Sequence, residues 1–149
     1  MRPNISVNTD RCKRRFAPPS TGRLLQPLEP MRTLQQILEE MNGAGLFFGV
    51  KVDSVHSERF SGETALHIFA KWGDAEAISI LVENGADINK RGEDQNTPLH
   101  YAAMLGKQQA VERLVTLGAK NLQDRYGNTP KQLAVDHLAV HEFLDKNGF

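Results

Sequence analysis

The stretches "TPLHYAAMLGKQQA" (Thr97–Ala110) and "TALHIFAKWGDAEA" (Thr64–Ala77) lie 33 residues apart and align without a gap. A third copy begins 32 residues further on, with "TPKQLAV" at Thr129. In both long copies a glycine, Gly73 or Gly106, separates a first apolar segment from a second one. A period of about 33 residues with two short helical segments per period indicates a stack of helix–turn–helix units.

Each copy also carries the signals of helix ends. Thr97 and Thr129 can cap a helix with their hydroxyl groups, and each is followed by a proline, which suits the first helical position. Thr129 and Gln132 have the spacing of a capping box. Gly85 and Gly118 close the second segments, where glycine favours a left-handed cap. We expect the polar segments between units to form short, hairpin-like projections.

The segments "GETALHIFAKWGDAEAISILVENGADIN" (62–89) and "NTPLHYAAMLGKQQAVERLVTLGAK" (96–120) resemble ankyrin repeats, and "GNTPKQLAV" resembles the start of a closing one. The resemblance implies an all-α ankyrin-repeat solenoid of stacked helix–turn–helix units with short hairpin-like projections. The short array of this chain resembles the stand-alone ankyrin arrays found in bacterial genomes. The repeats are expected within residues 53–149, at about 61–90, at 94–123, and as a shortened C-terminal cap at 127–149.

The chain before the repeats divides into two parts. Residues 1–30 are rich in Pro and Arg and hold six basic and two acidic residues, so we expect a disordered basic tail. Residues 31–52 begin with an amphipathic pattern closed by Gly43, which predicts an N-terminal capping helix followed by an insertion. Met31 is a candidate initiator, because the composition changes there.

Two departures from the repeat pattern have structural consequences. Gln95 stands where Gly62 and Gly127 precede the marker threonine by two residues, so we expect the middle projection to turn at Gly92 instead. The closing glycine follows the threonine by 19 positions in the third unit, against 21 in the other two. Lys131 also replaces a leucine there. These changes predict a terminal unit with a more polar outer face.

The resemblance also implies roles for individual residues. The structural positions are Thr64, His67, Gly73, Gly85, Thr97, His100, Gly106, Gly118 and Thr129. The partner-binding positions on the concave face are Phe60, Ser61, Glu63, Lys71, Trp72, Glu93, Asp94, Asn96, Met104, Leu105, Arg125, Tyr126 and Asn128. Asp136 and His137 hold equivalent positions in the shortened unit. Tyr126 is favoured as an interface anchor, whereas Trp72 fits either the interface or the core.

Candidates for chemistry are few. The recurrence of His67 and His100 at one repeat position favours packing over catalysis. The resemblance implies that each imidazole bonds to the backbone of the neighbouring projection. His137 and His141 lie four residues apart, which suits a metal, but only Asp136 and Asp145 offer further ligands. No nucleophile, phosphate-binding or dinucleotide motif is present. We therefore expect no enzymatic activity, no cofactor and no metal.

The predicted function is non-enzymatic binding of another protein through the concave face, as an inhibitor or regulator of that partner. The alternative is a nucleic-acid-associated regulator that uses the "RCKRR" cluster (11–15) of the tail, although we do not expect nucleic-acid binding. No apolar run has the length of a membrane helix. A single cysteine, Cys12, and no secretory signal favour a cytoplasmic, monomeric protein.

Overall fold

The structure is a computed structural model that describes residues 32–45 and 51–149. The predicted basic tail, the candidate start at Met31 and part of the insertion lie outside the described residues. Within the described ranges the regular structure is helical, and pairing between extended segments is limited to one isolated bridge between Glu58 and Thr64. The predicted all-α fold is confirmed.

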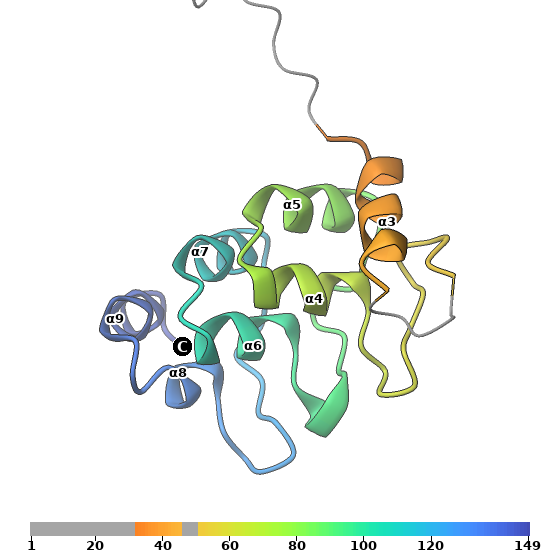
Figure 1. Cartoon of the computed structure of the whole chain (residues 1–149). Helices are drawn as coiled ribbons and strands as arrows, with labels where there is room; N and C mark the ends of the chain where they lie inside the picture. Colours follow the sequence, from red (N-terminus) through yellow and green to blue (C-terminus); the bar gives the residue numbers. More distant parts are fainter. Residues whose placement is uncertain (1–31, 46–50) are drawn as a thin grey trace, which may run out of the picture. The chain divides into compact units, whose positions relative to one another are not determined.

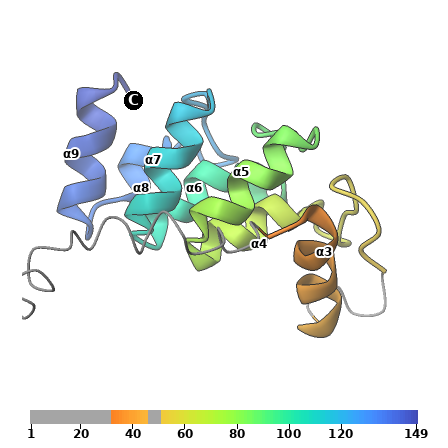
Figure 2. The same ribbon diagram turned by 90° about the horizontal axis from the view of Figure 1, so that it is seen from above.

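The helices pair as the repeat predicts. The first unit holds α4 (Ala65–Trp72) and α5 (Ala75–Glu83), the second α6 (Pro98–Met104) and α7 (Gln108–Thr116), and the third α8 (Pro130–Leu133) and α9 (Leu138–Lys146). The first helices of the units pack on one another in one layer, and the second helices pack in a layer beside them (Figures 1 and 2). The three units therefore stack side by side.

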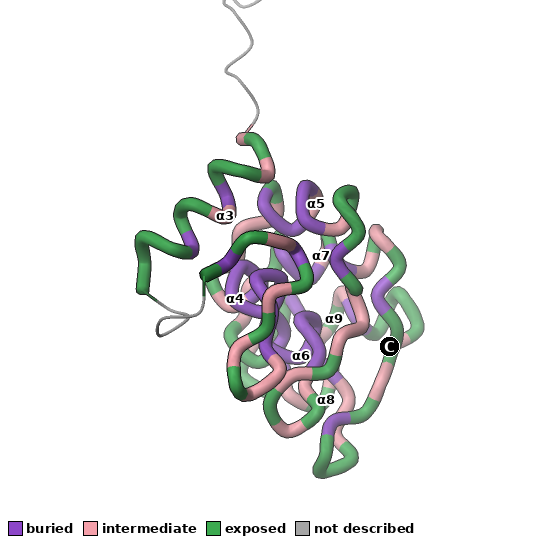
Figure 3. The backbone as a smooth tube through the Cα atoms, turned by 90° about the vertical axis from the view of Figure 1, so that its right-hand side faces the viewer, coloured by how far each residue is buried: buried purple, intermediate pink, exposed green. Residues whose placement is uncertain are grey.

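The core lies between these two layers. Leu66 and Phe69 of the first unit, Leu99 and Leu114 of the second, and Leu144 of the third are fully buried. Figure 3 shows the buried stretches concentrated in α4, α5 and α6, with exposed stretches in the projections. Each unit hides its apolar side against the next, which explains why a single unit would not be stable alone.

Helix α3 (Leu34–Gly43) precedes the first unit and packs against α5. It begins at a capping box, in which the Thr33 N–H donates to Gln36 Oε1 at 2.8 Å and the Gln36 N–H donates to Thr33 Oγ1 at 3.3 Å. Ile37 and Met41 face inward and are fully buried. The amphipathic pattern therefore does produce a helix, whose apolar side adds to the core of the first unit.

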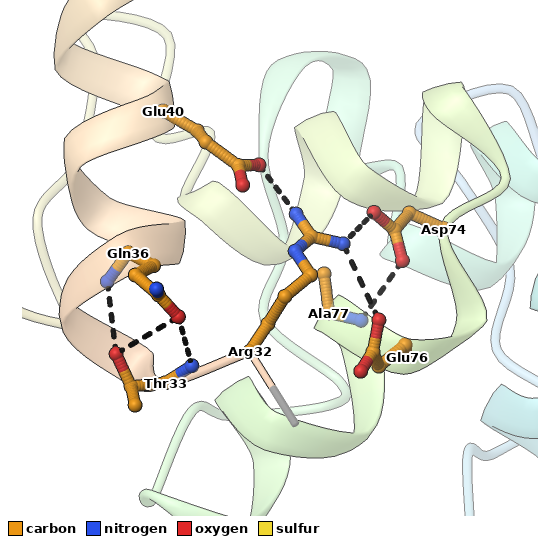
Figure 4. Close-up of polar contacts among 7 residues, drawn as sticks. All are labelled: Arg32, Thr33, Gln36, Glu40, Asp74, Glu76 and Ala77. Carbon is orange, nitrogen blue, oxygen red and sulfur yellow. Dashed lines mark hydrogen bonds and ion pairs between the residues drawn. The ribbon is translucent and has the colours of Figure 1, made fainter. Parts of the chain in front are cut away.

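Arg32 fastens the start of α3 to the start of α5 (Figure 4). Its guanidinium donates to Asp74 Oδ2 at 2.5 Å, lies 3.7 Å from a Glu76 carboxylate oxygen, and also pairs with Glu40 of α3. Asp74 has a second role, because its other oxygen accepts the Ala77 N–H at 3.0 Å and caps α5. One carboxylate thus caps a helix and holds the neighbouring helix in place.

The middle projection does turn at Gly92, whose carbonyl oxygen accepts the Gln95 N–H at 3.1 Å, but Gly92 does not supply the left-handed conformation. Gly92 has a φ of −101°, whereas Asp94 and Gln95 have φ values of 51° and 61°. Gln95 thus adopts the left-handed conformation that Gly62 and Gly127 adopt in the other projections, with φ values of 78° and 83°. A Cβ at position 92 would crowd two side chains of the preceding unit, at 3.1 Å from Glu63 Cγ and 3.2 Å from His67 Nε2.

Candidate protein-binding site

His67 joins the first unit to the projection of the second. The backbone N–H of Thr64 donates to His67 Nδ1 at 3.1 Å, so this nitrogen carries no proton. His67 Nε2 therefore carries the proton, and it lies 3.0 Å from the Lys90 carbonyl oxygen and 3.2 Å from that of Asn96. Both ring nitrogens are engaged, so this imidazole connects two units and is not free to transfer protons.

His100 repeats this arrangement one unit later. Its Nδ1 accepts the Thr97 N–H at 3.1 Å, and its Nε2 donates to the Asn128 carbonyl oxygen at 3.2 Å. Burial lowers the pKa of His100 and of His67 below the ordinary histidine value. Both imidazoles are therefore neutral structural groups at neutral pH.

Glu63 does not lie with the exposed residues that the resemblance groups it with. Its side chain is only 2% exposed, and its carboxylate pairs with Lys71 Nζ at 2.5 Å and with Arg59 at 3.2 Å. The Lys71 ammonium also lies 4.1 Å from the centre of the Tyr101 ring. Burial by itself raises the pKa of Glu63, but bonds from Lys71 and Tyr101 outweigh it, and the net pKa is lowered. The expectation of a free contact side chain at Glu63 is therefore corrected.

Asp124 shapes the third projection. Its Oδ1 accepts the backbone N–H groups of Tyr126 and Asn128, each at 2.8 Å. Burial raises the pKa of Asp124, but these bonds and one from the Asn128 side chain lower it by more, so the net pKa is below the ordinary value. The turn holds Arg125 and Tyr126 outward at the tip.

Among the described residues, the most exposed aromatic side chains lie at the tips of the projections. Phe60 is 96% exposed in the first projection, and Tyr126 is 71% exposed in the third. Between them the middle projection presents Glu93 and Asp94, and the Asp94 carbonyl oxygen accepts the Arg125 N–H at 2.8 Å. We call these five residues the tip row. This backbone bond links the second and third tips and supports the turn that carries Tyr126.

A second exposed apolar group lies where first helices turn into second helices. Trp72, Met104 and Leu105 are 42–47% exposed there, as the resemblance implies. Val135 and Leu138 are 78% and 70% exposed at the same turn of the third unit, and the sequence reasoning missed them. These five residues are called the helix-turn row. The turns that carry them follow one another along one side of the stack (Figures 1 and 2).

The remaining members of the predicted set are partly buried. Asn96 and Asn128 use their backbone carbonyls in the histidine joints, Lys71 pairs with Glu63, and Ser61 is half-buried in the first projection. The Trp72 ring packs edge-on against Phe69 at 5.2 Å and stays half-exposed, so it contacts both the core and solvent. A binding role for any of these residues stays a prediction.

The metal alternative has little geometric support. His137 packs against Gly106, where an added Cβ would come within 2.5 Å of His137 Nδ1, and Asp145 pairs with Lys131. Among the described residues no three His, Cys, Asp or Glu side chains gather in a way that could hold a metal ion. Cys12 and the basic cluster at 11–15 lie outside the described residues. No helix that the structure describes has the length and hydropathy to cross a membrane.

Comparison with known proteins agrees with this geometry. A family model described as ankyrin repeats in three copies matches residues 32–124, and the chain therefore belongs to the ankyrin-repeat family. The match starts at Arg32, so it includes α3. Ankyrin repeats are protein–protein interaction modules whose stacked units offer an extended surface.

Several curated proteins are similar to this chain. Mouse inactive serine/threonine-protein kinase TEX14 is 36% identical over 88 residues, which cover 58% of this chain and 6% of the relative. Serine/threonine-protein kinase 12 of Arabidopsis thaliana is 38% identical over 106 residues, covering 64% and 23%. Mouse protein phosphatase 1 regulatory subunit 27 is 36% identical over 85 residues, covering 56% and 53%. The chain thus spans about half or less of each relative, and these relatives come from mammals and a plant rather than from bacteria.

Proposed function

We propose that this chain is a non-catalytic module that binds a partner protein through the concave face built by the first helices and the projection tips. The observation that carries the proposal is the distribution of exposed apolar groups. The large exposed hydrophobic side chains of the described residues all belong to the tip row or the helix-turn row. In the layer of second helices, none lies on α5 or α7, and the one on α9 is Leu138 at its first residue, beside the turn.

Such a distribution is expected of a binding surface. Exposed aromatic and large apolar side chains cost free energy in water, and they commonly mark sites where another protein covers them. The ion pairs and histidine joints between the two rows hold the supporting backbone rigid, so little conformational entropy is lost on binding. The charged groups at the tips, Glu93, Asp94 and Arg125, favour correct orientation more than affinity.

We further propose that binding regulates the partner, in a cytoplasmic setting. This step is supported by relatives named as regulatory subunits, such as subunits 27 and 12A of protein phosphatase 1. A surface without catalytic groups can inhibit by covering a partner's site or by recruiting it. The nucleic-acid alternative depends on the tail outside the described residues, and no observation on the described residues favours it.

The test compares partner capture by three forms of the full chain. Affinity capture from extract of cells that express the protein, followed by mass spectrometry, defines the partners of the unchanged chain. Trp72→Ala combined with Tyr126→Ala should remove them, whereas Arg113→Glu, on the exposed side of α7, should not. Partners that survive the first pair and are lost with Arg113→Glu would place binding on the other layer.

A further inference from the structure

The helix-turn row contains an oxidisable side chain, Met104, in the middle unit of the stack. Met104 is the last residue of α6, and it is 42% exposed. Helices α4 and α8 of the neighbouring units pack on either side of α6 (Figure 1). The row continues in both of these units, where Trp72 is 47% exposed and Val135 is 78% exposed. The side chain of Met104 therefore lies at the centre of the exposed apolar row.

The described methionines differ sharply in access to solvent. The chain has four methionines, and two of them, Met41 and Met104, lie within the described residues. Met41 is fully buried on the inner side of α3. Oxidation of a methionine requires that the oxidant reach the sulfur, so Met104 is open to it and Met41 is protected. A sulfoxide at Met41 would place a polar group in the core, whereas one at Met104 stays in water and leaves the fold intact.

The oxidation needs no reactant other than a peroxide. A lone pair of the thioether sulfur attacks one oxygen of hydrogen peroxide, a sulfur–oxygen bond forms, and the oxygen–oxygen bond breaks. The leaving hydroxide takes the proton of the transferred oxygen and departs as water. The sulfur loses two electrons, the peroxide gains them, and the product is a neutral sulfoxide. Methionine sulfoxide reductases return the thioether with electrons from a thiol, so the change can be reversed.

We infer that Met104 is a site of reversible oxidation, at which a peroxide weakens the binding of the partner protein. The inference rests on the proposed function, since it assigns a form of regulation to the same surface. A thioether is apolar and packs well against irregular surfaces. The sulfoxide oxygen requires a hydrogen-bond donor, and a partner that covers the row with apolar groups removes the water that would supply one. The central position makes this loss large, because groups at the centre of an interface are the most fully desolvated.

The first measurement needs no partner. The full-length chain is treated with hydrogen peroxide, samples are digested at intervals, and mass spectrometry gives the sulfoxide fraction at each methionine. We expect Met104 to oxidise about tenfold faster than Met41 or more. The melting temperature of the treated chain should stay within about 3 °C of that of the untreated chain, because the altered side chain is on the surface. Equal rates at the two methionines, or a larger loss of stability, would contradict the inference.

The second measurement compares partner capture before oxidation, after removal of the peroxide, and after treatment with the reductases. The partners are the proteins that the untreated chain captures and that Trp72→Ala combined with Tyr126→Ala loses. Oxidation should lower their capture by about fivefold or more, and reduction should restore it. Met104→Leu is the matched control, because it keeps the other groups that peroxide attacks, including Met31 and Cys12. Whatever its starting level, capture by this variant should be the same before and after peroxide.

The outcomes separate the inference from the proposed function. Capture that does not respond to peroxide overturns the inference, and so does an equal loss in Met104→Leu or a loss that the reductases do not reverse. In each of these cases the proposed function stands, because it is defined by Trp72 and Tyr126 in the untreated chain. If the untreated chain captures no partner through those two residues, the proposed function fails and the inference falls with it.

Discussion

The joint between the first two units and the joint between the last two are each built around a histidine. The acidic residue near that histidine belongs to the same unit in the first joint and to the following unit in the second. His100 has Asp124 as its acidic neighbour, and Asp124 belongs to the following unit. His67 has Glu63 as its acidic neighbour, and Glu63 belongs to the same unit as His67. The position equivalent to Asp124 in the middle projection, five residues before the threonine, is Gly92.

The two arrangements compete for the same space. A Cβ on Gly92 would lie 3.1 Å from Glu63 Cγ and 3.2 Å from His67 Nε2, so these side chains would have to shift to admit an aspartate there. Without that aspartate the middle projection lacks the clamp that shapes the third one, and it turns through two residues with positive φ instead. The comparison teaches that each joint contains one carboxylate near its histidine, while the position that supplies it can change.

The largest effect should come from disrupting the packing of α3 on the first unit. Ile37→Asp places a charge on a fully buried position of α3, and we expect it to lower the free energy of unfolding by about 4 kcal/mol or more. Gln35→Asp, on the exposed side of the same helix, is the control and should change it by less than about 0.5 kcal/mol. Urea unfolding followed by circular dichroism measures both. Equal, small losses would mean that α3 contributes little to the first unit.

Removing either imidazole should have the next largest effect. His67→Ala and His100→Ala each leave a buried threonine N–H and at least one carbonyl without a partner, at a cost of about 2–4 kcal/mol. The loss should be larger for His67, because its Nε2 reaches two carbonyls. The same unfolding experiment checks the order. A larger loss at His100 would contradict the idea that the first joint depends more on its histidine.

Both joints should weaken together at mildly acidic pH. Burial depresses the pKa of both histidines in the folded chain, so the unfolded chain binds more protons below an unfolded pKa of about 6.5. The contribution of the two neutral histidines to the free energy of unfolding is complete above that pH. It is lost as the pH falls towards their lower pKa values in the folded chain. Two histidines give this slope an upper limit of two protons, about 2.7 kcal/mol per pH unit.

Urea midpoints between about pH 7.5 and about pH 5.5 measure this slope. His100→Gln should reduce it to about one proton, because only His67 then titrates with a depressed pKa. The lowered pKa of Glu63 acts further down, since its stabilisation is lost only below the ordinary glutamate value of about 4.3. A stability that does not change across the histidine range would show that the imidazoles are not held neutral.

The difference between the two joints can be tested by moving the carboxylate of the first joint to the position that it has in the second. Gly92→Asp alone should destabilise through the clash and the second negative charge, and Glu63→Asn alone should leave Lys71 without its carboxylate. The double variant reproduces the arrangement of the His100 joint. We expect a favourable coupling free energy of about 1–2 kcal/mol in a double-mutant cycle. Additive losses would mean that the two positions do not compensate each other.

The smallest effects concern the turns of the projections. Gln95→Gly should stabilise the chain by about 0.5–1 kcal/mol, because glycine adopts the left-handed conformation without strain. Gly127→Ala should destabilise the chain by about 1 kcal/mol, because alanine is strained in the left-handed conformation. A steric clash is not the cause, since nothing lies within 4 Å of the added Cβ. Melting temperatures of the two variants should therefore shift in opposite directions.

The sequence by itself determined the repeat period, the helices with their ends, and the structural role of the two histidines. These depend on local signals, such as threonine caps, glycine ends and apolar periodicity, which act within a few residues. The tip positions Phe60 and Tyr126 could also be found, because they lie four and three residues before their marker threonines, at positions that the resemblance assigns to contacts.

Only the tertiary structure decided which of the predicted contact residues are free. Glu63 is buried where Lys71 and Arg59 converge on it, and Glu63 and His67 crowd the space beside Gly92. The exposure of Val135 likewise depends on where the turn of the third unit lies in the stack. The physical reason is the same each time: burial, pairing and steric exclusion depend on neighbouring units, which local sequence patterns do not describe.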